Sequence, residues 1–252
     1  MAILLPTLQR VRNQARAVVC QANLKQWGTT LALYVEDNRG RLPCGYFDQR
    51  SLLRGLFRSE DDPNERLFDS LNPVDTKGIA CCPMAVRVRP SERGTWGSFE
   101  AWEIRGLGPP YRGSYGLNSR MFSLRGFGYE SFARFRGPRR FGSSGFINVF
   151  SVKDRAKVPV LLDCKRPSGS ASNFRGPPPT ERSLAYWGSF CMNRHNGHIN
   201  GLFLDWSVRN IGLKELWTLN WYREFDTSNP WTKAGGVLPE DWPQWMRSFK
   251  DY

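Results

Sequence analysis

The first 37 residues place the strongest constraint on how this chain folds. Apolar residues recur there at spacings of three and four, the period at which they line one face of an α-helix. The first stripe of such residues is narrow and consists of Leu4, Leu8, Val11, Ala15, Val18 and Ala22. Because no later segment is suited to cover it, we expect this stripe to associate with a partner helix.

A second, bulkier stripe follows in the later half of the same helix. It keeps the same spacings, is rotated around the helix axis, and consists of Cys20, Leu24, Trp27, Leu31 and Tyr34. Its aromatic side chains predict packing against a sheet. Gly40 can adopt the left-handed conformation that ends helices, and Pro43 cannot continue one. The sequence therefore predicts an N-terminal helix over residues 1–38 that projects at its start and is buried toward its end.

The remainder, residues 39–252, is predicted to be one globular domain built on an antiparallel sheet. Short apolar runs predict strands at residues 114–118 and 158–163. Two further runs, at 199–204 and 208–211, predict a β-hairpin. The predicted fold class is therefore α+β, with a long N-terminal helix packed on an antiparallel sheet.

Long irregular segments separate these predicted elements. Residues 124–146 are rich in Gly, Arg and Phe, and residues 165–182 contain three consecutive prolines, so both are expected to be loops. A tail over residues 213–252 begins with a short predicted helix and contains several tryptophans. Because tryptophans in a free tail would expose much apolar surface, we expect the tail to pack on the domain.

The chain is strongly basic, which bears on its partners. Its 36 Lys and Arg residues outnumber 23 Asp and Glu residues and give a net charge of +13. Such a charge attracts nucleic acid, anionic lipid or acidic polysaccharide at long range. The densest run of arginines has no nucleic-acid-binding motif beside it and consists of Arg134, Arg136, Arg139 and Arg140. A solvated basic surface is therefore the simpler interpretation.

Six cysteines are spread along the chain without any Cys-x-x-Cys pair. This spacing supports neither a zinc ribbon nor a thioredoxin-like motif. An even number of dispersed cysteines favours disulfides and an oxidising compartment. The alternative is a set of reduced, buried cysteines in a cytosolic protein.

Few residues suggest a metal site or catalysis. The two histidines, His195 and His198, could hold a divalent ion together with a carboxylate, although a structural turn is the favoured explanation of their spacing. Asp163 and Asp205 both follow predicted strands and would offer oxygen ligands to Ca²⁺ if they lay on one side of the sheet. The candidate metal ligands are Asp163, His195 and Asp205. No nucleophile elbow, phosphate-binding loop or acid pair is present, so we predict no catalytic residues.

Several short landmarks occur in a recognisable order. In the helix and just after it these are Leu4-Leu5-Pro6, Ala15, Cys20, Asn23-Leu24-Lys25-Gln26, Tyr34, Asn38, Gly40 and Pro43. In the domain they are Cys82-Pro83, Ser114-Tyr115-Gly116, Asn118, Asp163, His195-Asn196-Gly197, Asn200, Phe203, Asp205 and Val208. Over residues 1–211 the chain thus resembles bacterial prepilin-type proteins, the type II secretion pseudopilin-like (type IV pilin-like) family. Its tail resembles the C-terminal extension of one subgroup.

The resemblance implies a structural role without catalysis or a required cofactor. Such a subunit would assemble with itself and with other pilin-like subunits into a pseudopilus or extracellular filament, through the first stripe of the helix. It would be extracellular or on the cell surface, and in the periplasm and inner membrane before assembly. In the family an upstream leader is removed and a hydrophobic helix holds the subunit in the inner membrane before assembly; here the leader and most of that helix are expected to be missing.

Two further expectations accompany the resemblance. Cys20 is expected to form a disulfide with Cys82, or with Cys81, and so to fasten the helix to the domain. The family's Asp-Gly-His is Asp205-Trp206-Ser207 here, which removes one histidine from any metal site. The alternative function is a non-catalytic binding module that presents a basic, aromatic-rich surface to acidic glycan, lipid or nucleic acid.

Overall fold

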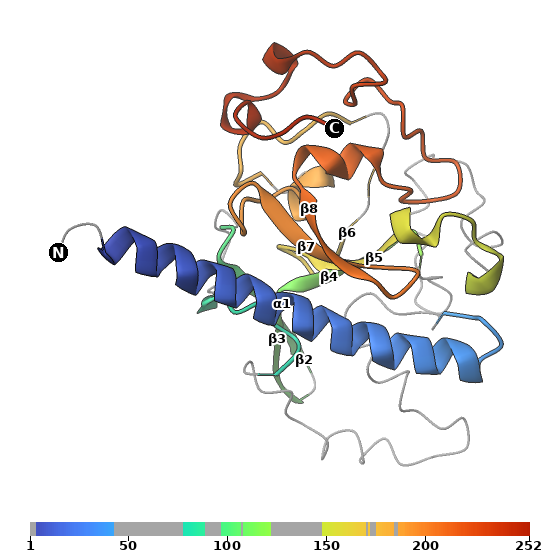
Figure 1. The fold of residues 1–252 in the computed structure, drawn as a ribbon. Coiled ribbons are helices and arrows are strands. Elements are labelled where there is room, and N and C mark those ends of the chain that lie inside the picture. Colours follow the sequence, from blue (N-terminus) through green and yellow to red (C-terminus); the bar gives the residue numbers. More distant parts are fainter. Residues whose placement is uncertain are drawn as a thin grey trace.

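A computed structural model describes most of the chain. The described residues are 4–42, 78–88, 97–106, 108–121, 148–169, 171, 175–183 and 186–252. They form an α+β fold in which one long helix, α1 (Leu4–Asp37), lies across a sheet (Figure 1). The predicted loop at 124–146 and the arginine run within it lie outside the described residues.

The central sheet has five strands. In spatial order they are β6 (Ser168–Gly169), β4 (Tyr115–Asn118), β5 (Pro159–Asp163), β7 (His198–Phe203) and β8 (Val208–Gly212). The two predicted strands and the predicted hairpin correspond to β4, β5 and the β7–β8 pair. Neighbouring strands are antiparallel except β4 and β6, which are parallel. The sheet is therefore mixed, not purely antiparallel as predicted, because the chain turns back after β5 and so runs in the direction of β4.

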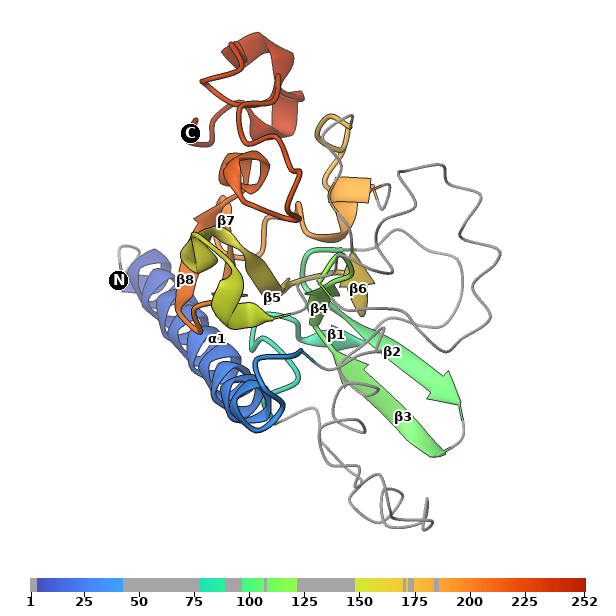
Figure 2. The same ribbon diagram turned by 90° about the vertical axis from the view of Figure 1, so that its right-hand side faces the viewer.

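A second sheet was not predicted from the sequence. It contains β1 (Arg87–Val88), β2 (Glu100–Gly106) and β3 (Gly108–Gly113), with β2 and β3 forming an antiparallel hairpin. Figure 2 shows this hairpin extending away from the central sheet. Glycines and two adjacent prolines in β3 disfavour a strand by propensity alone. Pairing with β2 outweighs that preference.

Packed side chains cover both faces of the central sheet. Because side chains alternate along a strand, Leu161 joins the core beneath α1 while its neighbour Leu162 joins a second core on the other face. The C-terminal segment covers this second face, on the side of the sheet opposite α1 (Figure 1). The sheet is thus the middle layer of three.

The second core is dominated by tryptophans, all of which except Trp187 come from the C-terminal tail. Trp187 stacks on Trp217 with ring centroids 4.5 Å apart, and Trp242 meets Trp217 edge-on at 5.3 Å. The short helix predicted from Leu213 is a 3₁₀ helix over Lys214–Thr218. The 3₁₀ helices of the described residues are Val149–Ser151, Arg155–Lys157, Tyr186–Ser189, Lys214–Thr218, Pro239–Asp241 and Gln244–Met246.

The two stripes of α1 have different surroundings. In the second stripe Cys20, Leu24, Trp27 and Leu31 are fully buried, whereas Tyr34 is half-buried and the neighbouring Val35 takes the core position. In the first stripe the side chains of Leu8, Val11, Ala15, Val18 and Ala22 are all exposed, and that of Leu4 lies outside the described part. The N-terminal end of α1 projects beyond the sheet (Figure 1).

The end of α1 depends on Gly40. The N–H of Gly40 donates to the Val35 carbonyl at 2.7 Å, and both Arg39 and Gly40 have positive φ, of 55° and 80°. The Gly40 carbonyl then accepts from the N–H of Val149 at 2.7 Å, so the helix end is tied to a later segment. A Cβ at position 40 would collide with the side chains of Asn148 and Phe150.

Gly40→Ala is expected to lower the free energy of unfolding by about 2–3 kcal/mol, through left-handed strain and this collision together. Gly236→Ala is a matched control, because Gly236 also has a positive φ, of 85°, but open space around its Cβ position. That control should lose only about 1 kcal/mol. Urea unfolding of both variants measures the difference, and equal losses would contradict the role of the Asn148 contact.

Candidate metal centre

Four side chains from four separate segments meet beneath α1. They are Cys20 from the middle of α1, Cys82 from the segment before β1, Asp163 from the end of β5, and His195 from the turn before β7. Their potential ligand atoms all lie within 4.8 Å of one another. We call these four residues the Cys₂AspHis cluster.

The closest contacts in the Cys₂AspHis cluster converge on shared atoms. His195 Nε2 lies 3.1 Å from Asp163 Oδ2 and 3.4 Å from Cys82 Sγ. Cys20 Sγ lies 3.8 Å and 3.7 Å from Asp163 Oδ1 and Oδ2. One nitrogen, two sulfurs and a carboxylate therefore face a common centre.

Local structure explains how each residue reaches this centre. Cys20 belongs to the buried stripe of α1, and Asp163 points to the same face of β5 as Leu161, two residues before it. His195 begins a tight turn in which Asn196 and Gly197 both have positive φ. The His195 N–H closes that turn by donating to the His198 carbonyl at 3.0 Å.

The segment that carries Cys82 is held from two sides. The Cys82 N–H donates to Ser114 Oγ at 2.6 Å, which ties it to the residue just before β4. Asn23 of α1 donates from Nδ2 to the Cys81 carbonyl at 2.9 Å. These bonds place the Cys82 thiol between helix and sheet.

A buried arginine neutralises the carboxylate of the cluster. Arg194 NH1 lies 2.9 Å from Asp163 Oδ1, and both side chains are 0% exposed. Asp163 Oδ2 also accepts the Asn200 N–H at 2.9 Å. Burial raises the pKa of Asp163, but the Arg194 charge and the His195 hydrogen bond outweigh it and lower this pKa to about 2. The carboxylate is therefore ionised at neutral pH.

The thiols and the imidazole are also perturbed. Burial raises the pKa of Cys20 well above its ordinary value. Burial likewise acts to raise the pKa of Cys82, but hydrogen bonds with Cys20 and His195 and the Arg194 charge lower it to about 7. Burial lowers the pKa of His195, yet its hydrogen bonds to Asp163 and Cys82 raise it to about 9. Negative charge is thus favoured at Cys82 and positive charge at His195.

A cysteine, a histidine and an aspartate in contact could suggest nucleophilic catalysis. Their contacts, however, are not those of a catalytic triad. In such triads the two ring nitrogens of histidine contact different partners, whereas here Nε2 faces both Asp163 and Cys82. Cys82 is also only 1% exposed. The surface hollow beside His198 and the one beside Glu181 are both lined by residues outside the cluster.

The metal ligands predicted from the sequence are only partly brought together. Asp163 and His195 meet, but Asp205 is exposed and accepts hydrogen bonds within its own turn, from the Ser207 N–H at 3.0 Å and from Ser207 Oγ at 2.6 Å. Because β5 and β7 are antiparallel and Pro159 pairs with Phe203, Asp163 and Asp205 lie at opposite ends of this strand pair, not together as expected. Two sulfurs and one carboxylate also fit Ca²⁺ poorly, since that ion takes six to eight oxygen ligands.

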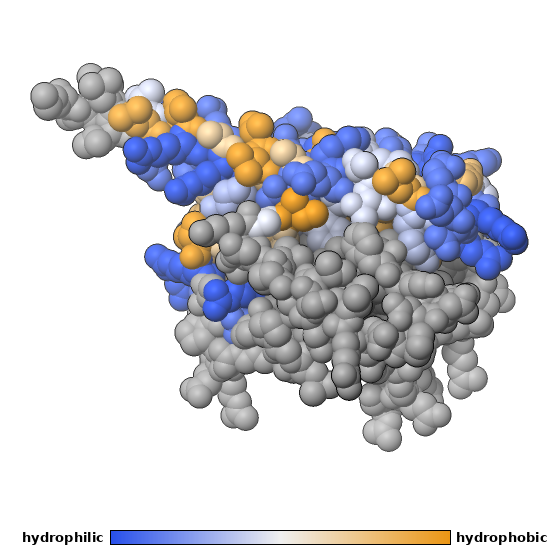
Figure 3. All heavy atoms as spheres, turned by 90° about the horizontal axis from the view of Figure 1, so that it is seen from below, coloured by the Kyte–Doolittle hydropathy of each residue, from blue (hydrophilic) through white to orange (hydrophobic). Residues whose placement is uncertain are grey.

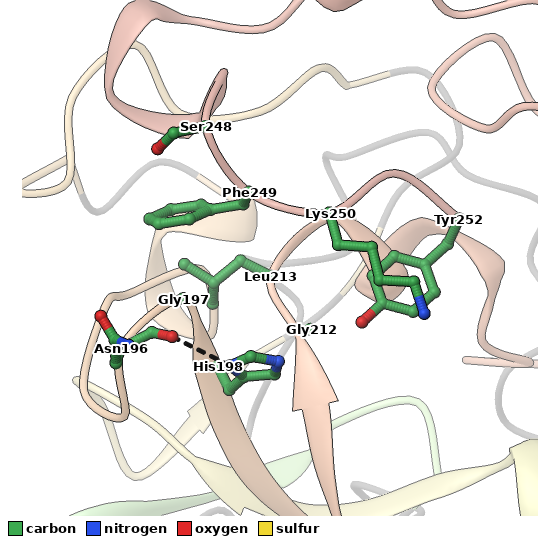
Figure 4. A pocket seen from close by; sticks show the side chains of 9 residues that line it. All are labelled: Asn196, Gly197, His198, Gly212, Leu213, Ser248, Phe249, Lys250 and Tyr252. Atoms are coloured by element: carbon green, nitrogen blue, oxygen red, sulfur yellow. Dashed lines mark hydrogen bonds between the residues drawn. The ribbon is translucent and has the colours of Figure 1, made fainter.

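The second histidine is separated from the cluster. His198 borders a shallow hollow between the β7–β8 hairpin and the end of the chain, and its Nδ1 lies 2.9 Å from the Asn196 carbonyl oxygen (Figure 4). Lys250 and Tyr252 form another side of this hollow (Figure 4). The His-x-x-His spacing therefore does not produce a pair of ligands.

The cysteines predicted to form a disulfide are neighbours with free thiols. Cys20 and Cys82 are both reduced in this structure and both belong to the cluster. Cys81, the other expected partner of Cys20, is also a free, buried thiol. Sequence reasoning singled out Cys20 with Cys82, and Asp163 with His195, as two separate features. It missed that they form one site, because no local spacing connects the four residues.

The exposed part of α1 is a second candidate functional surface. Leu8, Val11 and Val18 are 53%, 55% and 64% exposed. Seen from below, apolar residues continue along the projecting end of the helix among hydrophilic ones (Figure 3). In the described part of the chain, no helix combines the length and apolar character required to cross a membrane.

No protein-family model, curated protein or solved structure matches this chain.

Proposed function

We propose that this chain is a structural subunit of a pseudopilus or pilin-like extracellular filament that assembles through the first stripe of α1. The observation that carries the proposal is the contrast between the two halves of this helix. The second stripe, in its later half, is packed on the sheet, whereas Leu8, Val11 and Val18 of the first stripe remain exposed in a row. Exposed apolar residues in a regular row are typical of an interaction surface.

The free energy available from covering this stripe is substantial. Full burial of a leucine or valine side chain is worth about 1.5–3 kcal/mol relative to full exposure. Helices of neighbouring copies, packed side by side, would remove several such residues from water in each subunit. The projecting end of α1 leaves this stripe accessible to a neighbour (Figure 1).

Charges on α1 predict an unusual salt dependence for such assembly. Arg10, Arg12 and Arg16 are exposed next to the apolar stripe, so copies packed in register would bring like charges together. Added salt screens this repulsion and should favour assembly. Binding to a polyanion would respond in the opposite way, because salt weakens it.

The alternative binding module receives less support. All nine tryptophans among the described residues are buried or half-buried, so these residues form no exposed tryptophan face. The remaining support for a binding module is the net charge of +13. Self-assembly that increases with added salt would support the filament subunit, whereas polyanion binding that weakens with salt would support the binding module.

Leu8→Glu combined with Val11→Glu is expected to abolish assembly, because it places charges in the stripe. Two lost apolar contacts correspond to at least a ~100-fold higher concentration for association. Gln9→Glu combined with Gln14→Glu is the matched control, since both residues are exposed polar neighbours on the same helix. Sedimentation and electron microscopy at two salt concentrations measure the result. Monomers in all three proteins, or assembly unaffected by the stripe variant, would contradict the proposal.

A further inference from the structure

We propose that the Cys₂AspHis cluster is a binding site for a tetrahedrally coordinated thiophilic metal ion, Zn²⁺, which fastens α1 to the sheet. This inference is independent of filament assembly, because it concerns the buried half of the helix.

The positions of the donor atoms match the edges of a zinc coordination tetrahedron. With Zn–S bonds of about 2.3 Å and Zn–N or Zn–O bonds of about 2.0–2.1 Å, tetrahedral ligands lie about 3.3–3.8 Å apart. The contacts from His195 Nε2 to Asp163 and Cys82 are 3.1 Å and 3.4 Å, and Cys20 Sγ lies 3.7 Å from Asp163 Oδ2. Small side-chain movements complete the tetrahedron, since every pair lies within 4.8 Å.

The donor set selects the kind of ion. Two thiolates and one imidazole favour a soft or borderline ion, and a tetrahedral arrangement of sulfur and nitrogen donors is typical of zinc. The charges also balance: two thiolates and the Asp163 carboxylate contribute three negative charges, which Zn²⁺ and the buried Arg194 guanidinium neutralise. A buried site with no net charge avoids the cost of an unpaired ion.

Hydrogen bonds around the cluster are of the kind that orients metal ligands. Tyr115 donates from its hydroxyl to Cys20 Sγ at 3.3 Å, and the Met84 N–H donates to Cys82 Sγ at 3.4 Å. Asp163 receives Arg194 on one oxygen and the Asn200 N–H on the other. Both sulfurs and the carboxylate are thus held in position by a surrounding set of donors.

A disulfide between the two cysteines would explain less of this arrangement. It would bring the sulfurs to about 2.05 Å of each other and use neither the carboxylate nor the imidazole. Zinc uses all four groups and links the helix, the segment before β1, the end of β5 and the turn before β7. Metal binding would therefore stabilise the attachment of α1 as part of folding.

Metal binding to the full chain, purified anaerobically without chelator, tests the proposal. We expect one equivalent of zinc by elemental analysis, release by a chelator, and rebinding of ZnCl₂ with a rise in the unfolding temperature. Co²⁺ in place of zinc should give the visible absorption of a tetrahedral ion and a thiolate charge-transfer band. These measurements are made on the unaltered chain, so they do not depend on any variant folding.

Three matched pairs of variants locate the site. Cys82→Ser, His195→Ala and Asp163→Asn should each weaken zinc binding more than ~100-fold, since even residues around a metal's ligands contribute 10–100-fold. Cys81→Ser, His198→Ala and Asp205→Asn should bind normally, because these residues lie outside the cluster. The proposal is overturned if the reduced chain binds no zinc, if a Cys20–Cys82 disulfide is found in the anaerobic protein, or if both sets of variants bind equally.

Discussion

Arg194→Met is expected to lower the free energy of unfolding by about 3–5 kcal/mol, because it leaves the buried Asp163 carboxylate without its counter-charge. The pair is wholly enclosed, with both side chains 0% exposed and 2.9 Å between NH1 and Oδ1. Methionine keeps much of the arginine's volume. The decrease in the free energy of unfolding would therefore come mainly from the removed charge and its hydrogen bonds.

Arg194 also links the turn before β7 to the second sheet, whose strands pair with no strand of the central sheet among the described residues. Its guanidinium donates to the carbonyl oxygens of Ser98, Ser114 and Glu100 at 2.7, 2.9 and 3.2 Å. The Ser114 carbonyl would keep the Cys164 N–H, which donates to it at 2.8 Å. The Ser98 carbonyl, on a buried residue, would lose its guanidinium donor, at a cost of about 1–3 kcal/mol. We therefore expect the substitution to loosen the second sheet as well as the cluster.

Urea unfolding in the presence of a chelator measures this loss without a contribution from metal. Arg209→Met is the matched control, because Arg209 also forms an ion pair, with Glu215, but its side chain is 35% exposed. That variant should lose at most about 1 kcal/mol, the value typical of solvent-exposed pairs. Similar losses in the two variants would mean that burial does not control the strength of the Arg194 pair.

Trp27→Ala is expected to cost about 3–5 kcal/mol, the range for removing a large aromatic side chain from a core. Trp27 is 0% exposed, in the core between α1 and the sheet. Its Nε1 donates to the Ile79 carbonyl oxygen at 2.9 Å, so the substitution also removes a link between the helix and the segment before β1.

Leu33→Ala is the control for the tryptophan variant, because Leu33 lies on the same helix and is 64% exposed. Leucine and alanine both favour helix, so its effect should stay within about 0.5 kcal/mol. Thermal or urea unfolding compares the two. A small loss for Trp27→Ala would mean that the second stripe does not hold α1 to the domain.

Periodicity in the sequence was sufficient for α1 and for four of the five strands of the central sheet, β4, β5, β7 and β8. A helix of 34 residues presents its two stripes through local geometry alone, so its burial pattern follows from spacing. The hairpin β2–β3 was missed because its glycines and prolines disfavour strands, and only its pairing stabilises it. The parallel β6 was missed because two residues are too short for a pattern.

The residues of the candidate metal centre could be recognised one by one in the sequence, but their grouping could not. The residue types were informative, since Cys20, Cys82, Asp163 and His195 were each singled out. The sequence did not predict that these four residues combine, and it wrongly included Asp205. The reason is that the four residues come from four separate segments, and Cys20 and His195 are 175 residues apart. Spacing along the chain carries no information about contacts made by a helix lying across a sheet.

The sequence by itself determined the long helix, its exposed and buried stripes, the main strands and a folded, basic, tryptophan-rich chain, because these depend on local periodicity and composition. Tertiary structure alone decided which cysteines, carboxylate and imidazole share one buried centre, and that Arg194 neutralises Asp163 there. The physical reason is that packing α1 on the sheet brings distant residues together.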